Sequence, residues 1–163
     1  ISGTAALYTS QNPWHVDAED VQYGKAGKDV YSRNDIRNGG HFSMSALAQV
    51  YLDYQYSETT FRVGRQIFES FLTKSNDTKM IPNTFEGVTV HSKELKDTSI
   101  KLAYLTAQKL RDHTSFHDVI TFKDAADNSW ANNDDSAVNK ALSYADFVAA
   151  GEDPDHNLIV IEA

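Results

Sequence analysis

The run from Ala46 to Tyr56 alternates apolar and polar side chains, and this alternation constrains the fold more than any other feature of the chain. Even positions carry alanine, valine, leucine and tyrosine, whereas odd positions are mostly polar, with Leu47 and Tyr51 as exceptions. Successive side chains of a β-strand point to opposite faces of the sheet. The run therefore predicts a strand with one apolar and one wet face.

The same alternation recurs along the chain and predicts six strands. In the third, Phe61 and Val63 alternate with Arg62, while Arg65 breaks the pattern and predicts a position at a rim or a bulge. We expect the first and last strands to be truncated. The predicted strands are about 1–9, Ala46–Tyr56, Thr59–Phe68, Phe85–Lys93, Thr98–Lys109 and 157–163.

The connections between these strands alternate between long and short. The long ones span about residues 10–43, 69–84 and 110–156, and the short ones about 57–58 and 94–97. Antiparallel pairing then places every long loop at one end of the sheet, as in outer-membrane barrels with short periplasmic turns and long external loops. A compact soluble domain rarely carries loops above 30 residues. The sequence therefore predicts an all-β chain, with residues 1–163 forming part of one antiparallel transmembrane β-barrel domain.

Composition narrows the function classes. The formal net charge of −8 argues against a nucleic-acid partner, because phosphate binding needs a basic surface. The chain has no cysteine, which excludes disulfides, thiolate metal sites and cysteine nucleophiles. No run approaches 18 apolar residues, but barrel strands need only about 9–11 and escape hydropathy windows. No leader segment precedes Ile1, so we expect a mature chain or a piece of a longer one.

The run from Phe61 to Val90 contains three distinctive motifs. They are Gly64-Arg65-Gln66, Ser75-Asn76-Asp77-Thr78-Lys79 and Pro82-Asn83-Thr84-Phe85-Glu86-Gly87. With these motifs the run resembles the OprD family of outer-membrane porins, and the resemblance covers about residues 30–110. It implies an 18-stranded barrel, of which six strands are about a third, with the missing strands on both sides, because open sheet edges cannot be satisfied in hydrocarbon.

The resemblance also implies a function, namely passive and selective diffusion of small polar or carboxylate-bearing solutes across the outer membrane. In the family, the loop after the Gly-Arg-Gln strand folds into the lumen. Some relatives have prolines early in that loop where this chain has Phe71-Leu72, so the substrate preference does not transfer. The implied constriction residues are Ser75, Asn76, Asp77 and Lys79, and the implied pore-lining basic residues are Arg62, Lys93 and Lys101.

Each of these assignments has a plainer alternative. The basic residues would look the same on a solvated sheet face, and Asp77 fits an Asx-turn equally well. Five aromatic residues fit either a girdle at the membrane boundary or strand packing in a soluble core; they are Tyr51, Tyr54, Tyr56, Phe61 and Tyr104. The rival to the porin is accordingly a soluble β-rich binding module at the cell surface, which would fold alone in water.

Catalysis and cofactors find little support in the sequence. It has no nucleophile elbow, phosphate loop or dinucleotide fingerprint, so we predict no enzyme and no cofactor. His113 and His117 have helical i, i+4 spacing but lie in an expected loop, so no metal site is predicted there. The acidic loops lack EF-hand spacing, and the sequence leaves open whether they bind calcium. It also leaves open whether the protein forms a homo-oligomer. A short helix is expected over Ser136–Ala150, capped by Asp134 or Asp135.

Overall fold

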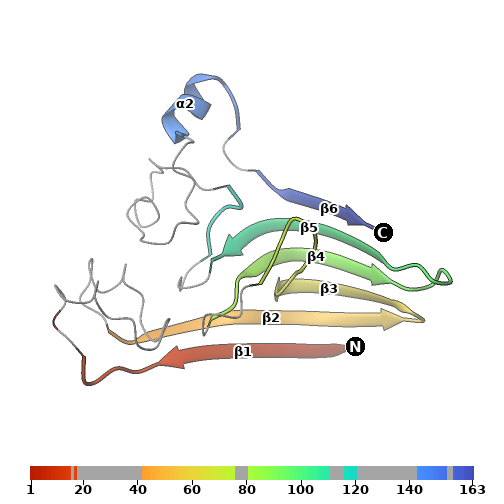
Figure 1. The fold of residues 1–163 in the computed structure, drawn as a ribbon, viewed down its shortest axis with the longest axis horizontal. Coiled ribbons are helices and arrows are strands. Elements are labelled where there is room, and N and C mark those ends of the chain that lie inside the picture. The colour runs from red at the N-terminus through yellow and green to blue at the C-terminus, as the bar shows by residue number, and fades with distance from the viewer. Residues whose placement is uncertain (16, 18–41, 76–80, 111–115, 121–142, 154–155) are drawn as a thin grey trace.

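The computed structural model describes residues 1–15, 17, 42–75, 81–110, 116–120, 143–153 and 156–163. Six strands form one antiparallel sheet in which every strand pairs with its neighbours in the chain, in the order β1-β2-β3-β4-β5-β6 (Figure 1). Among the described residues, no helix is long and apolar enough to cross a membrane. The predicted all-β antiparallel fold is confirmed. The elements are β1 Ser2–Ser10, β2 Met44–Tyr56, β3 Thr59–Gln66, β4 Thr84–Ser92, β5 Ile100–Lys109, α2 Tyr144–Ala149 and β6 Leu158–Glu162.

One face of the sheet, here called the outer face, is apolar and open. Its clearest row crosses five strands in register, and its side chains are 45–66% exposed. A contiguous exposed apolar surface of this kind marks contact with a membrane or a partner rather than with water. The row consists of Leu52, Val63, Val88, Tyr104 and Ile159.

The opposite, inner face carries the polar side chains. The row adjacent to the outer one runs through Asp53, Arg62, Thr89, Ala103 and Val160. Because side chains alternate along each strand, the period-two pattern of the sequence sorts the two faces as predicted. The sheet therefore separates an apolar outer surface from an inner surface that carries polar side chains beside two buried apolar clusters.

A β-bulge in β2 corrects one part of the predicted alternation. Ala6 pairs with Gln49 and Leu7 with Leu47, so Ala48 is an extra residue on β2. The extra residue inverts the alternation on the loop side of the bulge. Ala46 and Ala48 are consequently buried in an inner-face cluster, instead of lying on the face of Leu52, and Leu47 becomes 42% exposed.

The short turns lie at one end of the sheet and are bonded to each other. The Glu94 carboxylate in the β4–β5 turn accepts from the Glu58 N–H at 2.8 Å and from the Thr59 hydroxyl at 3.2 Å. The Lys93 N–H donates to the Glu58 carbonyl at 3.1 Å. The strand ends that lead into the long connections lie at the other end of the sheet, where helix α2 also lies (Figure 1).

Helix α2 falls within the expected helix over Ser136–Ala150, of which residues 136–142 lie outside the described residues. Its N-cap is Ser143, whose hydroxyl accepts from the Asp146 N–H at 3.3 Å. The two aspartates suggested as caps, Asp134 and Asp135, lie outside the described residues.

Candidate functional site

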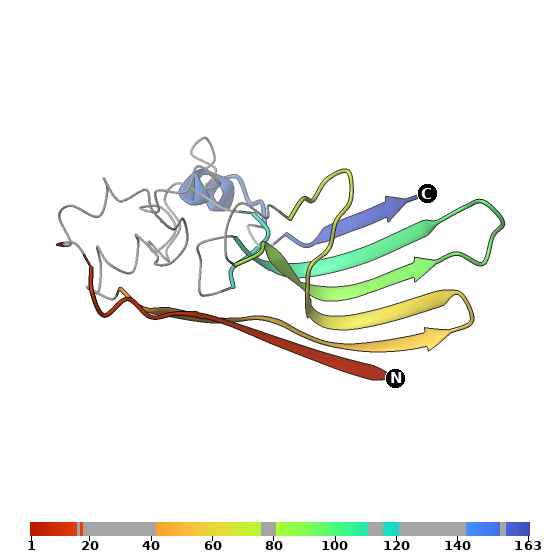
Figure 2. The same cartoon turned by 60° about the horizontal axis from the view of Figure 1, so that its bottom comes forward.

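The segment between β3 and β4 folds back over the inner face. We call its described part, residues 67–75 and 81–83, the inward segment. Figure 2 shows it arching over one side of the curved sheet rather than extending beyond the strand ends. Phe68, 7% exposed, leaves the line of β3 to enter a buried cluster on the inner face, which explains why β3 ends at Gln66 and not at Phe68 as predicted. The other members of this cluster are Phe85, Ala103, Leu105 and Val160.

The far end of the inward segment is anchored near β2. Ile81 is fully buried in a second inner-face cluster, against which Tyr8 of β1 packs. The other members of this cluster are Met44, Ala46 and Ala48. The two alanines have small side chains, which leave room for the backbone of the segment to pass close to the sheet. Both ends of the segment are therefore seated on the sheet by apolar burial.

A tight turn shapes the exposed part of the segment. The Ser70 hydroxyl accepts from the N–H groups of Leu72 and Thr73 at 3.1 Å, and the Thr73 hydroxyl donates to the Phe68 carbonyl at 2.9 Å. Such side-chain bonds to nearby backbone stabilise a turn without a sheet partner. The turn leaves Phe71 and Leu72 at its tip, 92% and 70% exposed.

Within the part of the chain that the structure describes, the inner face carries two charge-balanced pairs. Arg62 on β3 donates to both carboxylate oxygens of Asp53 on β2, at 2.6 and 2.8 Å, and its guanidinium lies 3.8 Å from the centre of the Tyr51 ring. A bidentate arginine–carboxylate pair fixes both side chains. Tyr51 therefore lies on the inner face and is not part of an outer aromatic girdle. Tyr54 and Phe61 do share the outer face, with ring centres 6.2 Å apart.

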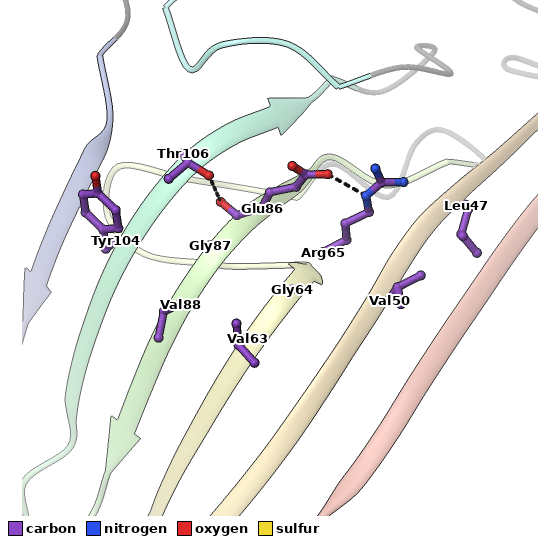
Figure 3. Close-up of a pocket in the computed structure, with 10 residues that line it drawn as sticks. All are labelled: Leu47, Val50, Val63, Gly64, Arg65, Glu86, Gly87, Val88, Tyr104 and Thr106. Atoms are coloured by element: carbon purple, nitrogen blue, oxygen red, sulfur yellow. Dashed lines mark hydrogen bonds and ion pairs between the residues drawn. The ribbon is translucent and has the colours of Figure 1, made fainter.

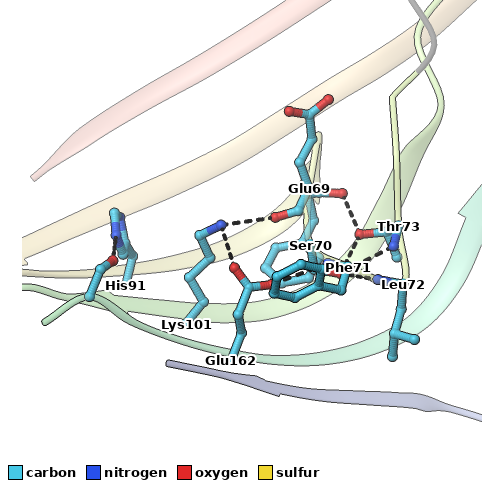
Figure 4. A network of polar contacts seen from close by, with 10 residues as sticks. Glu69, Ser70, Phe71, Leu72, Thr73, His91, Lys101 and Glu162 are labelled. Atoms are coloured by element: carbon cyan, nitrogen blue, oxygen red, sulfur yellow. Dashed lines mark hydrogen bonds and ion pairs between the residues drawn. The ribbon is translucent and has the colours of Figure 1, made fainter.

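The second pair joins the sheet to the inward segment (Figure 4). The Lys101 ammonium on β5 lies 3.0 Å from the Glu162 carboxylate on β6 and donates to the Glu69 carbonyl at 3.3 Å. The other Glu162 oxygen accepts from the Phe71 N–H at 3.2 Å. The pair therefore contacts two backbone groups of the segment on either side of Ser70.

Of the residues implied for the constriction, the structure describes only Ser75. It is half-buried in the inward segment, and its N–H donates to the Glu69 carboxylate at 3.3 Å. Asn76, Asp77 and Lys79 lie outside the described residues.

The three implied pore-lining basic residues are not equivalent in position. Arg62 and Lys101 lie on the inner face, each paired with a carboxylate. Lys93 is exposed and follows the end of β4, in the turn at the short-turn end of the sheet. The carboxylates of Asp53 and Glu162 were not singled out from the sequence. Only strand register brings them beside their partners, although both occupy polar positions in alternating runs.

A shallow groove of about 600 Å³ lies on the outer face, away from the inner-face pairs (Figure 3). Its walls include Val50, Val63 and Val88. At its upper end Arg65 forms an ion pair with Glu86 at 2.6 Å. Arg65 therefore faces outward at the loop end of β3, which agrees with the rim position expected from its break in the pattern.

An antiparallel meander with an apolar outer face, a polar inner face and a connecting segment folded over the inner face defines a piece of a transmembrane β-barrel. The matching family is the outer membrane porin, OprD family, over residues 20–152. The chain belongs to this family, and the resemblance stated from the sequence is confirmed.

Solved structures of Pseudomonas aeruginosa outer-membrane channels are similar to parts of the chain. OpdK, in a structure with vanillate, is 25% identical with a TM-score of 0.41 over 42% of this chain and 18% of its own. OccD3 (OpdP) is 22% identical with a TM-score of 0.47 over 53% and 21%. The chain thus spans about a fifth of these proteins. The comparison with curated proteins found no match.

Proposed function

We propose that the chain is a piece of an outer-membrane channel through which small polar solutes diffuse passively. The observation that carries the proposal is the position of the inward segment. It covers the polar face of the sheet, while the apolar face stays open to surrounding lipid. Because a barrel closed by further strands would enclose the inner face, this segment would narrow the enclosed pore.

The solutes proposed are small polar molecules, including those that carry a carboxylate. The inner-face ion pairs support weak and reversible contacts, because Arg62 and Lys101 already have carboxylate partners and do not present a bare cation. A conducting pore must bind its solute weakly enough to release it. We infer that any selectivity arises mainly at Asn76, Asp77 and Lys79, which in the chain connect the two described parts of the inward segment.

The deciding experiment is single-channel recording of the full-length parent protein in a planar lipid bilayer. We expect discrete conductance steps, and we expect added acetate or benzoate to change the open-channel current. A parent protein that stays soluble without detergent and never inserts would contradict the channel and favour the soluble binding module.

Charge in the segment after Ser75 should set ion selectivity. Asp77→Asn should lower the cation-to-anion permeability ratio, and Lys79→Gln should raise it, each by about fivefold, because a unit charge ~8 Å away in water shifts the energies of a cation and an anion by ~0.5 kcal/mol each in opposite directions. Reversal potentials under a salt gradient measure the ratio. Lys96→Gln, in the β4–β5 turn at the opposite end of the sheet, is the matched control. Unchanged reversal potentials in both segment variants would place these residues outside the constriction.

A further inference from the structure

The contacts between the Lys101–Glu162 pair and the inward segment are made to the main chain of the segment. Lys101 donates to the carbonyl of Glu69, and Glu162 accepts from the N–H of Phe71. The side chains of Glu69 and Phe71 are not needed for either bond. Two adjacent strands thus supply one donor and one acceptor to an exposed stretch of backbone that has no sheet partner there.

The polarity of this arrangement is fixed. The ammonium faces a carbonyl and the carboxylate faces an N–H, so each charge meets the backbone dipole that it attracts. Exchanging the two charges would keep the ion pair but would place a carboxylate against a carbonyl and an ammonium against an N–H. The two bonds from the pair to the backbone of the segment can therefore be tested separately from the ion pair itself.

The other contacts of the inward segment hold its ends but not its tip. Phe68 and Ile81 hold its ends by burial, but the tip between them is exposed, with Phe71 92% and Leu72 70% exposed. Within the described residues, the bonds at 3.2 and 3.3 Å from Glu162 and Lys101 connect this tip to the sheet.

We propose that Lys101 and Glu162 are positioning residues that clamp the backbone of Glu69 and Phe71 and thereby fix how far the inward segment reaches across the lumen. This inference rests on the proposed channel and assigns Lys101 an action through the segment rather than directly on the solute. Both bonds of the clamp are made to main-chain atoms, so the residues at the tip could vary in identity without losing their position.

The test compares two charge exchanges and one single substitution in the full-length parent protein, each on an Ala103→Cys background. Ala103 is 5% exposed and shares the buried cluster of Phe68, so a thiol there reports lifting of the segment. Residues 1–163 contain no native cysteine that would compete for the reagent. The clamp exchange is Lys101→Glu with Glu162→Lys. The matched control is Arg65→Glu with Glu86→Arg, a cross-strand pair on the outer face. Glu162→Gln is the mild variant, and heat-modifiable migration on gels verifies folding of each.

We expect the clamp exchange to raise the rate of thiol modification at position 103 about tenfold, the scale of losing a hydrogen bond to a charged group. Open-channel conductance should change in the same variant, and Glu162→Gln should be intermediate. The outer-face exchange should alter neither readout. If the clamp exchange behaves like the parent, the pair is only a β5–β6 brace and the proposal is overturned. If the parent conducts no current, the channel fails, while the thiol rates still decide the clamp.

Discussion

Leu52→Lys should destabilise the full-length barrel by about 2–4 kcal/mol, the cost of a lysine on the lipid-facing surface near the middle of the bilayer. Leu52 lies on the outer face, opposite Val63 of β3, and is 58% exposed. In the membrane this exposed surface contacts hydrocarbon, where an ammonium loses its hydration. Urea titration of the protein folded in lipid vesicles measures the change.

The same substitution discriminates between the channel and its soluble rival. In a water-soluble module, Leu52 would be an exposed surface residue, and its replacement would change stability by within about 0.5 kcal/mol. Thr4→Lys is the matched control, because Thr4 pairs with Tyr51 on the inner face, one position along from Leu52. We expect Thr4→Lys to be nearly neutral. Equal effects of the two lysines would remove the distinction between a lipid face and a water face.

Alternation in the sequence was enough to place most side chains on the correct face. Val63 and Val88 on one side, and Arg62 and Thr89 on the other, follow from period two alone. The inversion at Ala48 could not be predicted in this way, because a bulge is one extra residue and its position depends on the partner strand. Leu47, which broke the apolar–polar rhythm, was the only local signal of it.

The candidate site was less accessible from the sequence than the sheet. The family resemblance predicted a segment folded inward, and Phe68 and Ile81 show how burial holds it there. The partners of the basic residues were missed because they are remote in the chain: Glu162 is 61 residues from Lys101. Nothing local marks such a pair, since only the antiparallel register of β5 and β6 places Lys101 opposite Glu162.

A second large effect is expected at Gly64, which pairs with Gly87 across β3 and β4. Gly64 has a φ of +124°, and a Cβ built on it would collide with the Val50 carbonyl oxygen and lie 2.9 Å from the Tyr51 Cα. A Cβ on Gly87 would likewise collide with the Tyr104 carbonyl oxygen. These contacts are with backbone, so no side chain can rotate away. The two glycines form a crease where neighbouring strands approach more closely than a side chain allows.

We therefore expect Gly64→Ala to cost more than about 4 kcal/mol, because backbone strain of ~1–3 kcal/mol adds to the separation of β3 from β2. Gly3→Ala is the matched control: its Cβ would lie 3.3 Å from Cδ2 of the flexible Leu52 side chain and at an ordinary 3.9 Å from the Tyr51 carbonyl oxygen, so about 1 kcal/mol is expected. Urea midpoints in lipid vesicles compare the two variants. Equal midpoints would show that the crease can relax, and the curvature of the inner face would then not depend on this glycine pair.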